Sequence, residues 1–147
     1  MKHSCASFVF FLIVCFTATV AGSKVDREEL AVTTVQEFTA EYNNRDIDKL
    51  VSLYATDAIM VSEAGVAQGR DAIKDRLSVG IQHGNTIASL RPEKSASSGN
   101  LSFTEGIAEV ISGGQRLERH YLVVVNREGS HSEIVIHYSL PSPAKAP

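Results

Sequence analysis

The chain has 147 residues, of which 44% are hydrophobic, and a formal charge of −3 at pH 7. Positive and negative side chains are mixed along it without a basic block, which excludes the usual signature of a nucleic-acid-binding surface. About 125 residues follow the N-terminal apolar segment, enough for one domain with a core of its own.

The N-terminus has the three-part pattern of a secretory signal peptide. A lysine and a histidine precede an apolar run over residues 8–16, and small residues continue to Ser23. The run is shorter than the roughly 20 residues that a membrane-spanning helix needs. We therefore expect residues 1–22 to be a signal peptide, with cleavage after Gly22 favoured over a cut one residue earlier. The mature protein would be secreted, or periplasmic in a Gram-negative source, and not held at a membrane.

The cysteines and prolines suggest where the domain begins and ends. Both cysteines, Cys5 and Cys15, lie in the signal segment, so the mature chain has no thiol and must be stabilised by packing. Residues 141–147 contain three prolines, which remove backbone donors and fix φ. We expect a Pro-rich tail there, which leaves residues 23–140 as the domain.

Three amphipathic helices are predicted in the first part of the domain. Apolar side chains recur at helical spacing over residues 25–43, 47–54 and 71–81. Asp46 can cap the second helix, and Gly84 ends the third. A short strand, residues 58–62, separates the second helix from the third.

The remainder of the domain is rich in β-branched and aromatic residues. Glycine-containing turns divide it into four predicted strands, over residues 86–95, 101–112, 116–126 and 132–140. Short turns between them predict an antiparallel meander. Residues 122–125 are apolar at every position, so we expect this strand to be central and covered on both faces. The predicted fold class is α+β, with three N-terminal helices packed on a curved antiparallel sheet.

This order of elements resembles the cone-shaped NTF2-like superfamily, and short stretches of sequence agree with it. Residues 42–58 are similar to the family's acidic corner, a helix carrying Leu and an aromatic, and an Asp-Ala pair opening a strand. Residues 68–73 resemble its Gly-Arg-x-Ala-Ile helix start, and residues 121–125 with Gly129 resemble its closing hairpin. The chain is most similar to the SnoaL-like and DUF4440-type groups, although residues 130–134 lack the Trp usual there.

The resemblance implies a cavity inside the cone, which relatives use for isomerisation, dehydration, epoxide hydrolysis, cyclisation, carriage or dimerisation. Along the ketosteroid isomerase pattern, Phe38 falls at the oxyanion-donating tyrosine and Ser62 at the aspartate base. Phe38 has no hydroxyl and Ser62 is no base at neutral pH, so that reaction is disfavoured. Glu63 would replace the base only after a one-residue slip that exposes the apolar face of the strand.

One histidine and several aromatic residues are candidates for the site. His137 shares a strand face with Val135 and Ser139, where it could enter the cavity as a general acid or base or be held structurally. The aromatic candidates could line the cavity or form the core that closes it, and a buried tyrosine hydroxyl needs a partner. Candidate catalytic residues are His137 and Tyr54. The predicted pocket consists of Phe38, Tyr42, Tyr54, Met60, Ser62 and His137.

The remaining polar residues have structural interpretations. Glu105 and Glu109 are expected to form cross-strand ion pairs with Arg116 and Arg119 on an exposed face. Tyr121 and the histidine before it are expected at a solvated edge. No histidine pair has helical ligand spacing, so no metal and no cofactor are expected.

The sequence therefore predicts a secreted domain that binds a small, largely apolar molecule in its cavity, forms a homodimer through its sheet, or does both. It has no evident catalytic constellation. The alternatives are an isomerase, dehydratase or cyclase-type enzyme using His137 with a tyrosine, and a structural component of an extracellular matrix. Asn100 begins an Asn-Leu-Ser sequon and is a candidate glycosylation site if the source is eukaryotic.

Overall fold

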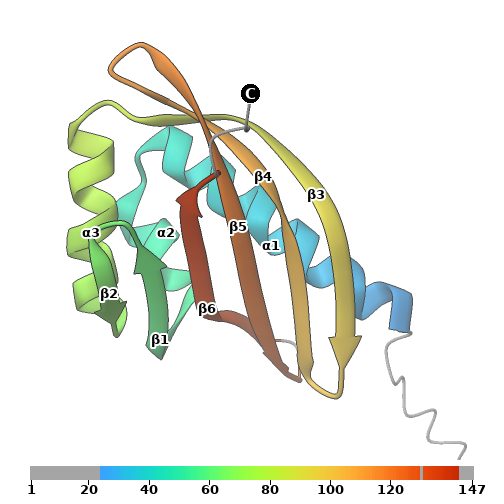
Figure 1. Ribbon diagram of the computed structural model, residues 1–147. Coiled ribbons are helices and arrows are strands. Elements are labelled where there is room, and N and C mark those ends of the chain that lie inside the picture. The colour runs from blue at the N-terminus through green and yellow to red at the C-terminus, as the bar shows by residue number, and fades with distance from the viewer. Residues whose placement is uncertain (1–23, 130, 143–147) are drawn as a thin grey trace, which may run out of the picture.

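The computed structural model describes residues 24–129 and 131–142 as three helices packed on one six-stranded sheet (Figure 1). The helices are α1 (Lys24–Asn44), α2 (Ile47–Ser52) and α3 (Arg70–Gln82). The strands are β1 (Tyr54–Ser62), β2 (Gly65–Gln68), β3 (Thr86–Ser98), β4 (Leu101–Ser112), β5 (Gln115–Glu128) and β6 (His131–Pro141). The predicted α+β class is confirmed. The signal segment and residues 143–147 of the predicted tail lie outside the described residues, and Pro141 is the last residue of β6.

The strand order is β2-β1-β6-β5-β4-β3, and β3 to β6 form the predicted antiparallel meander. The expectation of a purely antiparallel sheet is wrong at one junction, because β1 runs parallel to β6 with Met60 opposite His137. The short strand β2, which pairs with β1, was not predicted either. Both features depend on pairing with another strand, which no local pattern records.

The second helix ends earlier than its periodicity predicts. Tyr54 continues the helical stripe of α2, yet it is the first residue of β1 and pairs with Ile134 of β6. The backbone N–H of Ile134 donates to the Leu53 carbonyl at 2.7 Å, which draws the chain into the sheet. Aromatic residues also favour strands over helices. The tyrosine ring is thereby placed between the helices and β6.

The sheet is curved (Figure 1). In Figure 1, β3 to β5 curve around α1, which lies in the concave side. Gly106 of β4 pairs with Pro92 of β3, and a Cβ atom there would lie 2.2 Å from the Arg91 carbonyl oxygen. A glycine in a strand interior often marks such a close backbone approach, and a register shift follows Pro92.

The central strand β5 is covered on one face only. Val123 and Val125 are buried against the helices, whereas Leu122 and Val124 are half-buried on the outer face. The expected second apolar layer is not supplied by any of the described elements. The outer face of the sheet therefore remains partly exposed and apolar.

Candidate functional site

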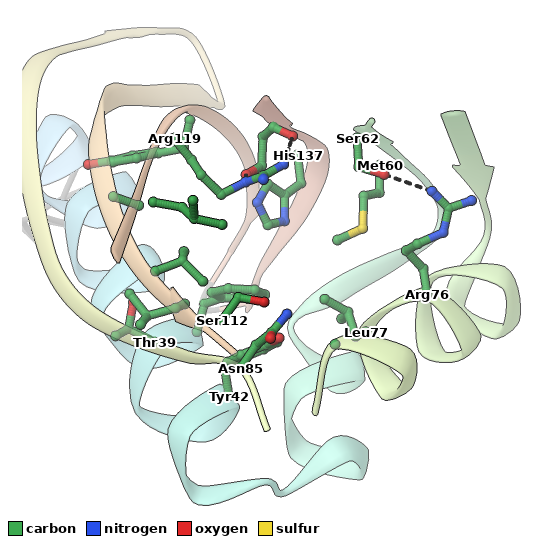
Figure 2. Close-up of a pocket in the computed structure, with 18 of the residues that line it drawn as sticks. Thr39, Tyr42, Met60, Ser62, Arg76, Leu77, Asn85, Ser112, Arg119 and His137 are labelled. Carbon is green, nitrogen blue, oxygen red and sulfur yellow. Dashed lines mark hydrogen bonds between the residues drawn. The ribbon is translucent and has the colours of Figure 1, made fainter. Parts of the chain in front are cut away.

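A cavity of about 420 Å³ lies between the concave face of the sheet and helices α1 and α3 (Figure 2). Residues of β1, β3, β4, β5 and β6 line it together with residues of α1 and α3, and on β5 every second residue from 117 to 123 does so, as the period of a strand predicts. Much of its wall is apolar, with contributions from Val35, Phe38, Met60, Leu77, Leu90 and Val123. Its volume falls within the range of about 300–1,000 Å³ typical of small-molecule sites.

The structure brings the predicted pocket residues together with one exception. Phe38, Tyr42, Met60, Ser62 and His137 all line the cavity. Tyr54 does not line it and is fully buried. Phe38 packs its ring perpendicular to the imidazole of His137, with centroids 5.0 Å apart. Phe38 therefore closes the wall around the histidine instead of offering it a hydrogen bond.

His137 and Tyr54 form a buried hydrogen bond in the wall of the cavity. The Tyr54 hydroxyl lies 2.6 Å from Nδ1 of His137. Burial raises the pKa of the Tyr54 phenol well above its usual value, and burial together with the positive charge of Arg119 lowers the pKa of His137 to about 4. Both groups are therefore neutral at pH 7. The buried Tyr54 hydroxyl has no other acceptor among the described residues, so we assign it as the donor to Nδ1, which places the imidazole proton on Nε2. At neutral pH the ring is a weak base that offers an N–H group.

Arg119 and Tyr121 line the cavity, where the sequence interpretation had not placed them. Tyr121 is only 5% exposed, so the expectation of a solvated edge is wrong for Tyr121, whereas His120 before it is exposed as expected. Both residues share the inward face of β5 with the buried Val123, and counting back from Val123 in steps of two would have found them. Of the expected ion pairs, that between Arg116 and Glu109 forms.

Three hydrogen bonds hold Arg119 at the end of the cavity beside the turn between β1 and β2, which we call the mouth. Its Nη1 donates to Glu63 at 2.8 Å, while Nε and Nη2 each donate to Ser139 at 3.1 Å, to the hydroxyl and to the carbonyl oxygen. Its side chain is 17% exposed and that of Glu63 is 57% exposed. The expected pairing of Arg119 with a glutamate of β4 is therefore wrong, because Arg119 points to the opposite face of the sheet.

A second arginine, Arg76 of α3, contacts the residues on either side of the turn between β1 and β2. The same turn contains Glu63, the partner of Arg119. Its Nη1 donates to the Ser62 hydroxyl at 2.7 Å and, more weakly, to the Gly65 carbonyl oxygen at 3.4 Å. Ser62 stands at the position of the aspartate base in the isomerase pattern. Its hydroxyl therefore accepts a hydrogen bond from an arginine. This contact was not predictable from the sequence, because Arg76 lies off the apolar stripe that predicted the helix.

Tyr42 and Asn85 lie on the opposite side of the cavity from Arg119 and His137 (Figure 2). Burial raises the pKa of Tyr42, and a hydrogen bond with Asn85 and the charge of Arg119 offset part of this rise. The Tyr42 hydroxyl approaches the backbone closely at Gly80, where a Cβ atom would lie 2.4 Å away. The buried Oδ1 of Asn85 has no hydrogen-bond partner among the described residues. The cavity therefore has polar groups on two opposite sides (Figure 2).

Two further observations concern parts of the chain other than the cavity. Asn100 is exposed in the turn between β3 and β4, where the sequon was noted. Within residues 24–129 and 131–142, every helix is too short or too polar to span a bilayer.

Comparisons with known proteins agree with this geometry. The sequence profile of the SnoaL-like domain matches residues 35–134. No curated protein matches the chain at a significant level. An NTF2-like protein from Pseudomonas putida KT2440 superposes with a TM-score of 0.69 at 16% identity, covering 84% of this chain and 93% of that protein. A ketosteroid isomerase-like protein from Erwinia carotovora atroseptica SCRI1043 superposes with a TM-score of 0.70 at 12% identity, covering 80% and 98%. These structural likenesses extend to the fold, and the matched profile shows that the chain belongs to the SnoaL-like domain family.

Proposed function

We propose that this protein binds a small, largely apolar molecule in the cavity between its helices and its sheet. The observation that carries the proposal is the cavity of about 420 Å³, whose lining is largely apolar. Efficient proton transfer is disfavoured for two reasons. Nδ1 of His137 is engaged by Tyr54 and its pKa is lowered to about 4, and Glu63 is paired with Arg119.

The neutral fluorophore N-phenyl-1-naphthylamine tests this proposal. We expect saturable fluorescence enhancement with the wild-type protein, because the dye is apolar and small enough for the cavity. Ala108→Phe should abolish it, since Ala108 is buried in the cavity wall and the larger ring would occupy the space. Ile107→Phe is the matched control, because Ile107 is half-buried on the outer face of the same strand. Failure of the folded wild type to bind, or undiminished binding by folded Ala108→Phe, would contradict the proposal.

An acid/base enzyme of the isomerase, dehydratase or cyclase type is the second candidate, favoured by the hydrogen bond between Tyr54 and His137. Such an enzyme would exchange the α-protons of a bound enolisable ketone, which NMR in D₂O detects with 2-indanone as the probe. Exchange that is lost in His137→Gln and retained in Ile107→Phe would support this candidate. Absence of exchange above the buffer rate would leave binding as the better proposal.

The partly exposed outer face of the sheet supports a homodimer. Ile59 of β1 and Ile136 of β6 are direct neighbours and are 37% and 40% exposed. Val66 of β2, 66% exposed, lies beside them, opposite Val61. Apolar strips of this kind are often covered by a partner. We include dimerisation through this face in the proposed function.

Export of the protein is also part of the proposal, supported by the signal-like pattern of residues 1–22. Expression of the full chain in a secreting host, followed by N-terminal sequencing, tests it. We expect the secreted product to begin at Ser23. A product that stays inside the cell with Met1 intact would contradict export.

A further inference from the structure

The charged groups at the mouth of the cavity do not balance. Arg76 and Arg119 both line it, and the carboxylate among the lining residues is that of Glu63. Glu63 pairs with Arg119 at 2.8 Å. In the described part of the chain no carboxylate pairs with Arg76, whose hydrogen bonds go to Ser62 and Gly65. The mouth therefore carries an excess of one positive charge.

This excess charge acts on the interior of the cavity. Arg119 is mostly buried, whereas its partner Glu63 is largely in solvent, where water screens the carboxylate. After burial, the positive charge of Arg119 contributes to the lowered pKa of His137 on β6, and it offsets part of the rise that burial causes in the pKa of Tyr42 on α1. Its field therefore reaches residues on two sides of the cavity.

Three of the hydrogen-bonding groups near the mouth are donors only, whereas the Glu63 carboxylate accepts and the hydroxyls of Ser62 and Ser139 can do both. Because Tyr54 occupies Nδ1 of His137, the remaining nitrogen of this lining residue is an N–H donor. The guanidinium groups of Arg76 and Arg119 are donors only. A ligand amide or ammonium group would place donors against these donors. A carboxylate accepts at both oxygens and pairs well with guanidinium groups.

We propose that the ligand is an apolar carboxylic acid bound as its anion, with the carboxylate at the mouth beside Arg119 and Arg76 and the apolar body inside. This inference rests on the proposed function and adds the chemical class of the ligand. One carboxylate neutralises the single excess charge. The apolar body lies among Phe38, Met60 and Leu77, which line the interior.

Isothermal titration calorimetry with 2-naphthylacetate and 2-naphthylacetamide tests the inference, because the two compounds share their shape and differ in charge. We expect the wild-type protein to bind the acid about tenfold more tightly than the amide, as charge-assisted hydrogen bonds are the stronger kind. Glu63→Gln removes the competing carboxylate from Arg119, so it should tighten binding of the acid about threefold and leave the amide unchanged. Glu105→Gln, an equal charge change at an exposed site on β4, should alter neither.

Arg76→Gln provides an independent variant should Glu63→Gln fold poorly. It should weaken binding of the acid several-fold without affecting the amide, because Arg76 contributes the unbalanced charge. Equal affinities for acid and amide in the wild type, or insensitivity of the acid to both Glu63→Gln and Arg76→Gln, would overturn the inference. If the neutral dye N-phenyl-1-naphthylamine still binds in that case, the proposed function stands. If neither naphthyl compound nor the dye binds, both fall.

Discussion

Acidification should destabilise the protein through His137. In the unfolded chain its pKa is the ordinary 6.5, and in the folded protein burial and Arg119 lower it to about 4. Above pH 6.5 the ring is neutral in both states and no penalty exists. Between pH 6.5 and about 4 the unfolded chain binds a proton that the folded protein does not, so stability falls as the pH falls. A shift of about 2.5 units at about 1.36 kcal/mol each gives a full penalty of about 3 kcal/mol below pH 4.

Urea unfolding followed by circular dichroism at several pH values measures this penalty. His137→Gln lacks the titrating ring but retains the carboxylates, so its curve subtracts their effect. We expect the free energy of unfolding of the wild type to fall by about 2 kcal/mol more than that of the variant between pH 7 and pH 5. Parallel curves for the two proteins would refute the burial of a neutral imidazole at this position.

Three substitutions test other parts of the structure. Gly106→Ala should cost about 2 kcal/mol of stability, because its Cβ would lie 2.2 Å from the backbone oxygen of Arg91; an unchanged urea midpoint would contradict the close approach. Tyr54→Phe should cost about 1–3 kcal/mol at pH 7 because it leaves Nδ1 of His137 buried without a donor, and equal stability in urea would contradict that hydrogen bond. Ile136→Lys should convert a dimer into a monomer in light scattering with little change in melting temperature, and a wild-type protein that is already monomeric would refute the sheet dimer.

Elements with a local period were predictable from the sequence. The stripe of α1, which includes Val35, Phe38 and Tyr42, recurs at helical spacing and is buried as expected. The meander followed from glycine-containing turns between β-rich runs. The parallel pairing of β1 with β6 was not predictable in this way, because it joins Met60 to His137, far apart in the chain.

The polar part of the site was harder to predict for a different reason. Arg119 lies in a charged stretch that is typical of a surface, and only the alternation continued from Val123 places it inside. Arg76 lies on α3 and Asn85 lies shortly after its last residue. The positions of both side chains therefore depend on how α3 packs against the sheet, which involves elements distant in the sequence. Propensity and periodicity describe single elements, so they give the walls of the cavity more readily than its polar groups.

Native mass spectrometry of the mature protein purified from its own source, followed by denaturing extraction, tests whether the cavity is a binding site. We predict a discrete added mass on the folded protein that is released on denaturation as a small, largely apolar molecule. A clean mass of the unliganded protein, together with no saturable binding of N-phenyl-1-naphthylamine, would contradict binding in the cavity.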